Sequence, residues 1–258
     1  MKTNKKLSDN KQETSHPSPL GEGPGIRLLD EFPSSVRLFL FDMDGVLYNS
    51  MPNHVIAWQE SMKSFDLEMS VDDVYATEGM RGVETIQRMV KEQQRRIIDE
   101  EEALRMYNEK ARIFATLPEA PVMEGVMEVM NKIQQANMLI GVVTGSAQRP
   151  LLERLEQDFG MFVPSHHVVS AFDVSRGKPA PDPYLMGLRK AGDIPATAAV
   201  VVENAPMGVR AGVAAGIFTV AVNSGPLPNS VLAGEGANIV FDDMPQFRDN
   251  WDELFLKR

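Results

Sequence analysis

Residues 36–45 read VRLFLFDMDG, a mostly apolar run that ends at two aspartates and a glycine. A short apolar run is typical of a strand that is buried on both faces of a parallel sheet. Three later runs have the same form, with apolar residues followed at once by polar ones: 138–143, 198–202 and 217–222. These four runs predict strands of one sheet.

Helical patterns separate the later strands. They lie near 125–136, 149–159, 183–191 and 208–215. Repeated alternation of strand and helix is typical of α/β proteins, in which helices cover a parallel sheet. We predict a Rossmann-like, doubly wound parallel-sheet core formed by residues 35–50 and 119–258. Its active site is expected at the carboxyl ends of the strands.

Residues 51–118 interrupt the core after its first strand. They contain no strand-like run, and their apolar residues recur at helical spacing. The positions are Val55, Trp58, Met62 and Phe65, then Ile86, Met89 and Val90, then Leu104, Tyr107 and Ala111. We therefore predict an inserted, small all-helical domain. Residues 1–34, rich in Lys, Ser, Pro and Gly, are expected to form a disordered tail, with a docking role as the alternative.

Composition limits the function classes. The 258 residues are 43% hydrophobic and 24% charged, as in a folded protein of one large or two unequal domains. With 26 basic and 36 acidic side chains the net charge is -10, so nucleic acid is not an expected partner. The absence of cysteine excludes disulfides and thiolate sites. Without an apolar segment for export or membrane insertion, we expect a cytoplasmic protein; its oligomeric state is not indicated.

Polar residues follow each predicted strand. Asp42 and Asp44 are two carboxylates at a strand end, where Gly45 allows a sharp turn beside a ligand. An Asp-capped turn is the alternative interpretation. Glu203 and Asn204 end another strand with oxygen-bearing side chains, which suit a hard divalent cation.

Two further segments carry candidate binding groups. Thr144, Gly145 and Ser146 offer hydroxyls and N–H groups before a helix, a favourable anion site, although a plain helix N-cap is the alternative. Lys178 lies in a proline-stiffened loop that holds a cation in place, with an ordinary surface lysine as the alternative.

Taken in order, these segments resemble the haloacid dehalogenase-like (HAD) superfamily, and within it the β-phosphoglucomutase-like branch of phosphatases and mutases. The similarity spans about residues 36–240 and consists of four motifs. They are Asp42-Met43-Asp44-Gly45, Thr144-Gly145-Ser146, Lys178 within GKPAPD, and Glu203-Asn204-Ala205-Pro206-x-Gly208. The resemblance implies a Rossmann-like core, a mobile helical cap inserted after the first motif, and magnesium-dependent phosphoryl transfer.

The resemblance also implies roles. Asp42 would be the nucleophile that forms an aspartyl phosphate, and Asp44 the general acid and then base. Thr144 would bind phosphoryl oxygens, and Lys178 would offset their charge. The neighbouring groups implied to bind substrate are those of Gly45, Gly145 and Ser146. Because Asp44 supplies an acid that halide release does not need, phosphorus chemistry is favoured over carbon–halogen cleavage.

By the same resemblance Mg²⁺ would be held by Asp42, the Asp44 carbonyl, Glu203 and position 204. The family usually has Asp at this last position, whereas this chain has Asn204. One negative charge fewer predicts weaker Mg²⁺ binding than in an Asn204→Asp variant. The alternative is that the amide is an adequate ligand.

Two residues of the insert resemble substrate-side groups. His54 has the spacing of a mutase histidine that positions the acid/base; the alternative is a polar residue on a first helical turn. Arg81 lies in a segment that resembles the cap substrate loop, and a solvated surface arginine is the alternative. The mutases have Arg where this chain has Thr85, which disfavours mutase activity.

Three functions remain open. The first is a Mg²⁺-dependent phosphatase for a small phosphorylated metabolite, with a sugar phosphate favoured. The second is a β-phosphoglucomutase-type isomerase that returns the phosphoryl group to a sugar. The third, suggested only by Asn204, is a catalytically weak protein that binds phosphorylated ligands.

Overall fold

The computed structural model describes residue 33 and residues 35–255, so the tail predicted for 1–34 lies outside the described residues except for Pro33. The strands are β1 (Leu38–Phe41), β2 (Leu139–Val143), β3 (Val168–Val169), β4 (Ala199–Glu203), β5 (Phe218–Val222) and β6 (Ile239–Phe241). The helices of the insert are α2 (Met51–Lys63), α3 (Val71–Thr77), α4 (Gly82–Gln94) and α5 (Glu100–Phe114). The remaining helices are α6 (Val126–Gln135), α7 (Arg149–Phe159), α8 (Asp182–Lys190), α9 (Pro206–Ala214), α10 (Asn229–Gly234) and α11 (Met244–Phe255).

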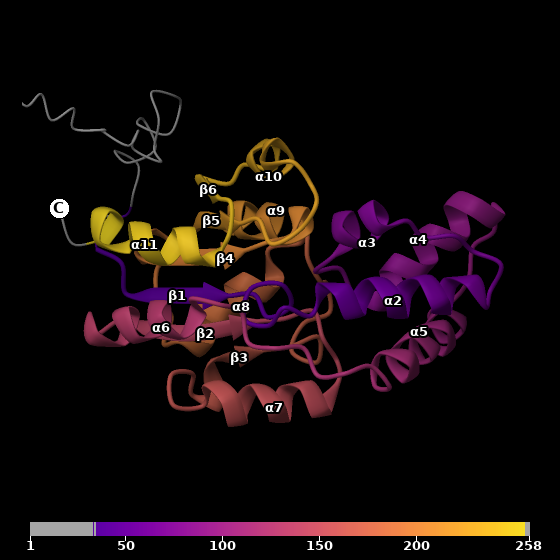
Figure 1. Cartoon of the computed structure of the whole chain (residues 1–258), viewed down its shortest axis with the longest axis horizontal. Coiled ribbons are helices and arrows are strands. Elements are labelled where there is room, and N and C mark those ends of the chain that lie inside the picture. The colour runs from indigo at the N-terminus through magenta and orange to yellow at the C-terminus, as the bar shows by residue number, and fades with distance from the viewer. Residues whose placement is uncertain (1–32, 34, 256–258) are drawn as a thin grey trace, which may run out of the picture. The chain divides into compact units, whose positions relative to one another are not determined.

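The strands form one parallel sheet in the order β3-β2-β1-β4-β5-β6. The chain builds outward from β1 in one direction and then returns to build in the other. Helices α6, α7 and α11 cover one face of the sheet, and α8, α9 and α10 cover the other (Figure 1). The predicted Rossmann-like, doubly wound core is therefore confirmed.

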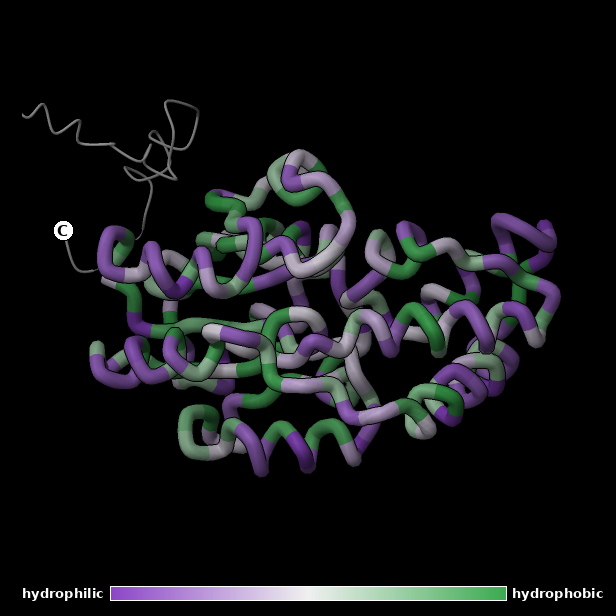
Figure 2. The backbone as a smooth tube through the Cα atoms, viewed as in Figure 1, coloured by the Kyte–Doolittle hydropathy of each residue, from purple (hydrophilic) through white to green (hydrophobic). Residues whose placement is uncertain are grey.

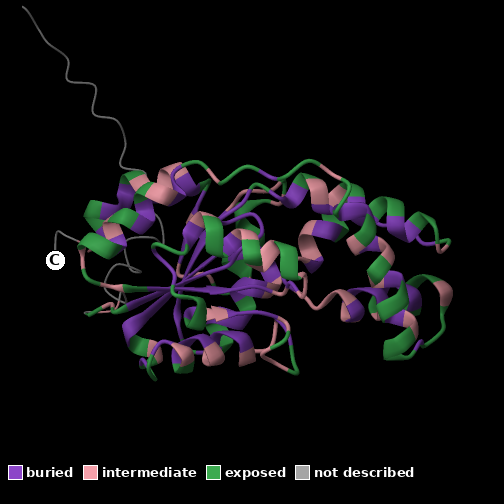
Figure 3. Cartoon of the chain, turned by 90° about the horizontal axis from the view of Figure 1, so that it is seen from below, coloured by how far each residue is buried: buried purple, intermediate pink, exposed green. Residues whose placement is uncertain are grey.

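Strand β1 shows why its sequence is a continuous apolar run. Its four residues are all fully buried, because helices cover both faces. Leu38 and Leu40 pack into a cluster with Tyr184 of α8 on one face, while Phe39 contacts Trp251 of α11 on the other. The strands are the hydrophobic and buried centre of the fold (Figures 2 and 3).

The four insert helices, called the cap helices from here on, have an apolar core of their own. Its buried members are Met51, Trp58, Met62, Leu67, Met69, Val74, Val83, Ile86, Met89, Val90, Ile98, Ala103 and Met106. The predicted all-helical insert is thus confirmed. Its bounds at 51 and 118 stay a prediction, since the described residues form one compact unit.

The structure differs from the sequence interpretation in two respects. Strands β3 and β6 have only two and three residues, too few for a periodic pattern to reveal them. Leu104, one of the apolar residues at helical spacing, is 46% exposed. The buried face of α5 instead carries Ala103, Met106 and the cation Lys110, which a hydropathy pattern assigns to solvent. Among the described helices, none has the length and apolar character needed to cross a membrane.

Candidate active site

Strand register brings the predicted site residues to one edge of the sheet. Phe41, the last residue of β1, lies opposite Val142 of β2 and Val202 of β4. The residues that follow these strands therefore emerge side by side at the carboxyl edge. Asp42 and Glu203 meet there around a single lysine.

Lys178 is the centre of this cluster and is only 1% exposed. Its Nζ donates to Asp42 Oδ1 at 2.5 Å, to Glu203 Oε1 at 2.6 Å and to the Val143 carbonyl at 3.0 Å. These three acceptors match the three N–H donors of an ammonium group. Burial alone would lower the pKa of Lys178, but the two carboxylates outweigh it and raise that pKa. The alternative of a plain surface lysine is excluded.

Asp42 lies in an excess of negative charge. Burial raises the pKa of its carboxyl well above the usual value, and the charges of Glu203 and Asp44 add to this effect, while Lys178 opposes it. One cation thus faces several carboxylates. A further cation at this edge would stabilise the ionised form of Asp42.

Glu203 is anchored on all sides and fully buried. Its Oε1 accepts from Lys178 and, at 2.5 Å, from the Tyr184 hydroxyl, and its Oε2 accepts from the backbone N–H groups of Asn204 and Ala205. Gly208 is required beside it, because an added Cβ would lie 1.9 Å from Oε1. Tyr184 was not predicted from the sequence, in which it is one aromatic residue of a core helix.

Asn204 presents an unsatisfied oxygen. Its Nδ2 donates to Ser224 Oγ at 3.3 Å, whereas its buried Oδ1 has no hydrogen-bond partner among the described residues. The turn after β1 packs against this amide: Gly45 has a φ of 81°, and an added Cβ would lie 2.0 Å from Nδ2. A buried, unpartnered carbonyl oxygen near a carboxylate is a suitable ligand for a hard cation.

No three His, Asp or Glu side chains within 35–255 form a ready metal cluster. Asn204 Oδ1 is the buried oxygen that the structure leaves without a partner among the described residues, and it suits a hard cation. The Asp42 carboxylate and the Asp44 carbonyl stay predicted ligands. Both Glu203 oxygens already accept hydrogen bonds. Its predicted role as a ligand stays a prediction.

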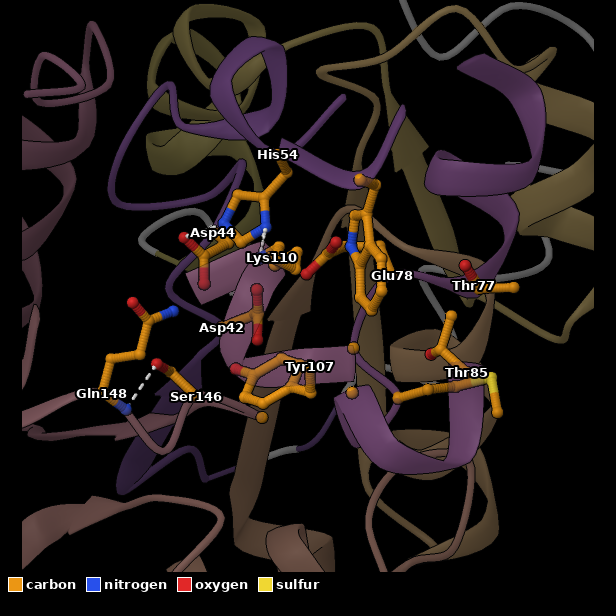
Figure 4. Close-up of a pocket in the computed structure, with 15 residues that line it drawn as sticks. Asp42, Asp44, His54, Thr77, Glu78, Thr85, Tyr107, Lys110, Ser146 and Gln148 are labelled. Carbon is orange, nitrogen blue, oxygen red and sulfur yellow. Dashed lines mark hydrogen bonds and ion pairs between the residues drawn. The ribbon is translucent and has the colours of Figure 1, made fainter. Parts of the chain in front are cut away.

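A second hydrogen-bonded chain holds Asp44. Ser50 Oγ donates to Asp44 Oδ1 at 2.7 Å. His54 Nε2 lies 3.1 Å from the same oxygen, and Lys110 Nζ lies 3.0 Å from His54 Nδ1 (Figure 4). A charged lysine can only donate, so His54 Nδ1 accepts and the ring proton lies on Nε2, directed at Asp44.

The electrostatics of this chain favour an ionised Asp44. Burial would raise the pKa of Asp44, but His54, Ser50 and Lys110 outweigh burial and lower it to about 2. Burial lowers the pKa of Lys110 to about 8, against the attraction of Glu78 and Asp44. Lys110 was missed in the sequence; the only signal was its position in the apolar stripe between Met106 and Ile113 of α5.

Both clusters border one cavity of about 40 Å³ between the cap helices and the sheet edge (Figure 4). Its lining residues are Asp42, Asp44, His54, Trp58, Thr77, Glu78, Gly79, Met80, Gly82, Thr85, Tyr107, Lys110, Gly145, Ser146 and Gln148. This volume holds a few waters and is too small for a sugar, so a larger substrate requires the cap helices to move. Sequence reasoning missed Glu78, Tyr107 and Gln148.

The predicted anion site is only partly open. Thr144 is buried, and its Oγ1 accepts from the backbone N–H of Ser146 at 3.0 Å. Ser146 Oγ in turn accepts from the N–H of Gln148 (Figure 4). Gly145 lies against the cap, since an added Cβ would be 3.0 Å from the Gly79 carbonyl. The structure thus places Gly145 and Ser146 on the cavity.

Arg81 does not line the cavity. Its guanidinium donates to the Ser175 carbonyl at 3.1 Å and to Glu100 at 3.3 Å, and it also faces Glu84. The side chain therefore links the cap to a loop of the core. Its predicted role in binding substrate remains a prediction.

Comparison with known proteins gives consistent results. A family model described as "haloacid dehalogenase-like hydrolase" matches residues 36–216. Hexitol phosphatase A of Escherichia coli (strain K12) is 31% identical over 188 residues, which cover 72% of this chain and 82% of that protein. Validoxylamine A 7'-phosphate phosphatase of Streptomyces hygroscopicus subsp. limoneus is 28% identical over 215 residues, or 82% and 96% of the two chains. A solved structure from Bacteroides vulgatus, provisionally described as a beta-phosphoglucomutase, has a TM-score of 0.82 and 45% identity, and covers 87% of this chain and 91% of its own.

Proposed function

The chain belongs to the haloacid dehalogenase-like hydrolases, and from this premise we propose that it is a Mg²⁺-dependent phosphatase acting on a phosphorylated sugar or polyol. The observation that carries the proposal is the meeting of two carboxylates in different environments at one cavity. Asp42 is bound to Lys178, and Asp44 to His54 and Ser50. The two relatives named as phosphatases of a hexitol phosphate and of validoxylamine A 7'-phosphate support this substrate class.

In this mechanism Asp42 attacks phosphorus. A bond forms between a carboxylate oxygen and phosphorus, and the bond to the sugar oxygen breaks. Asp44 gives a proton to the departing oxygen and later removes one from the water that hydrolyses the aspartyl phosphate. The incoming phosphate dianion favours the protonated form of Asp44, and its departure restores the ionised form that His54 and Lys110 favour.

The remaining groups hold charge in place. Lys178 offsets the charge that develops on Asp42 and the phosphoryl group. Gly145 and Ser146 line the cavity and can bind the phosphoryl oxygens. Asp42, the Asp44 carbonyl and Asn204 would hold Mg²⁺, with Glu203 adding negative charge beside it. When bound, the ion neutralises the transferring phosphoryl group.

A direct assay tests this function. Purified protein with Mg²⁺ is incubated with glucitol 6-phosphate, glucose 6-phosphate or p-nitrophenyl phosphate, and inorganic phosphate is measured. Release that needs Mg²⁺ supports the phosphatase. No release from any compound, together with retained binding, favours the catalytically weak binding protein.

A β-phosphoglucomutase-type isomerase is the second candidate function, because the similar structure from Bacteroides vulgatus is provisionally described as a beta-phosphoglucomutase. Incubation with β-glucose 1-phosphate and a trace of the bisphosphate, followed by phosphorus NMR, separates the two. Accumulating glucose 6-phosphate would establish the isomerase. Inorganic phosphate as the sole product would establish hydrolysis.

We expect Asn204→Asp to bind Mg²⁺ about tenfold more tightly than the wild type, since ligand charge tunes the affinity for hard cations. Titration calorimetry measures this without turnover. Asn131→Asp is the control, because it adds the same charge on an exposed part of α6. Equal or tighter binding by the wild type would show that the amide is the better ligand.

We expect kcat/KM to fall as the pH rises through about 8, where Lys110 loses its proton. A neutral lysine can accept as well as donate, so the ring proton of His54 is no longer fixed on Nε2. Lys110→Arg keeps the charge and should move this alkaline limb upward by about one pH unit or more. Lys63→Arg, exposed on α2, is the matched control. If the alkaline limb of the pH profile lies at the same pH in Lys110→Arg as in the wild type, the limb reports the titration of another group.

A further inference from the structure

Among the residues that the structure describes, none that lines the cavity is a free cation. Its basic lining residues are His54 and Lys110, and both belong to the chain that holds Asp44. Lys178 has its three donors occupied, and Arg81 is directed at Ser175 and two glutamates. A ligand with a second phosphate therefore finds no unengaged positive group among the described residues that line this cavity.

Glu78 adds a carboxyl group on the cap side of the same cavity. It follows helix α3, and its carboxylate points into the cavity (Figure 4). Burial raises the pKa of this carboxyl, with Asp44 adding to the effect, while His54 and Lys110 oppose it. Glu78 thus interacts with the same charged groups as the proposed acid/base, but its pKa is raised where that of Asp44 is lowered.

Close backbone packing holds the segment of Glu78 against the core in this arrangement of the cap. An added Cβ on the next residue, Gly79, would lie 3.1 Å from Lys178 Cδ, and the Gly79 carbonyl lies against Gly145. The cap segment that carries Glu78 therefore rests on the loops that hold the proposed catalytic groups. Asp42 and Glu78 line the same cavity, so a substrate whose phosphate lies at Asp42 would extend toward the cap wall that carries this carboxyl group.

The rest of the cap wall is neutral and polar. Thr77, Thr85 and Tyr107 carry hydroxyl groups on this wall. Those of Thr77 and Thr85 donate to backbone carbonyls and can still accept a hydrogen bond. Hydroxyls of a sugar can donate to Glu78 and exchange hydrogen bonds with these neighbours. A second phosphate would instead meet a like charge with little solvent to screen it.

We infer that Glu78 is a specificity-determining residue, which accepts hydrogen bonds from substrate hydroxyls and rejects compounds that carry a second phosphate. This inference rests on the proposed phosphatase function and narrows its substrates to monophosphorylated, otherwise uncharged polyols and sugars.

Two competitors that differ by one phosphate test the inference. Hydrolysis of p-nitrophenyl phosphate is the reporter, and glucose 6-phosphate and glucose 1,6-bisphosphate are the inhibitors. We expect the wild type to bind the monophosphate at least tenfold more tightly. In Glu78→Gln, which keeps the shape but removes the charge, this preference should fall at least tenfold, chiefly through tighter binding of the bisphosphate.

Glu60→Gln is the matched control, since it removes one charge from an exposed position of α2 and should keep the wild-type preference. The inference is overturned, while the proposed function stands, if Glu78→Gln is active and keeps the wild-type preference for the monophosphate. The same holds if the wild type binds the bisphosphate as tightly as the monophosphate. Absence of phosphate release from the reporter and from the sugar phosphates overturns the proposed function, and the inference with it.

Discussion

Asp42→Asn should lower kcat for phosphate release by about 10⁴-fold or more, the largest effect expected of any single substitution in this chain. An amide is too weak a nucleophile to attack phosphorus, so the covalent step is lost. Its oxygen can still accept from Lys178, which keeps Glu203 and the Val143 carbonyl as partners. The fold should therefore persist, as circular dichroism and a melting curve would show.

The control for this substitution is Asp72→Asn, which changes an exposed aspartate of α3 in the same way. It should retain wild-type kcat. If Asp42→Asn keeps more than about a tenth of the activity, another group is the nucleophile. Mass spectrometry of acid-quenched enzyme gives an independent readout, because the wild type should gain one phosphoryl group and the variant none.

Asp44→Asn should reduce kcat/KM for glucitol 6-phosphate by about 10²–10⁴-fold, and much less for p-nitrophenyl phosphate. A sugar alkoxide needs a proton as it leaves, whereas nitrophenolate is stable without one. The second step, however, loses its base with either substrate. We therefore expect the variant to release a burst of nitrophenol equal to the enzyme concentration, followed by slow turnover.

The size of the difference between the two substrates is the deciding quantity. Equal losses for both would contradict proton donation by Asp44. Ser50→Ala serves as the comparison, since it removes one hydrogen bond to Asp44 and leaves the carboxylate itself in place. It should lower the activity on both substrates by a similar, smaller factor.

Residues at strand ends were predictable because sequence order and sheet geometry together decide where they lie. Asp42 and Glu203 follow apolar runs whose strands are neighbours, so the register alone brings them together. Lys178 was predictable through its motif, although its three acceptors were not. These positions follow from the local sequence pattern and from the small number of topologies open to alternating strands and helices, which bring the carboxyl ends of the strands to one edge.

Residues of the cap were predictable only as helix. Lys110 is a buried cation, which hydropathy assigns to the surface, and Glu78 resembles any acidic residue at the end of a short helix. Arg81 lies in a segment that resembles the cap substrate loop, but its side chain is directed at Ser175 and does not line the cavity. Side-chain direction depends on how the cap helices pack on the core, and one sequence does not carry that information.

The two tryptophans of the chain lie one in each apolar core. Trp251 is buried against the rings of Phe39 in β1 and Phe247 in α11, while Trp58 borders the cavity with the Lys110 ammonium 5.2 Å from its ring centre. Tryptophan fluorescence therefore has two separate sources. Replacing Trp251 by phenylalanine leaves a tryptophan emission that comes from the cap alone when it is excited beyond the absorption of tyrosine, so ligand entry and cap movement become visible in solution without any attached dye.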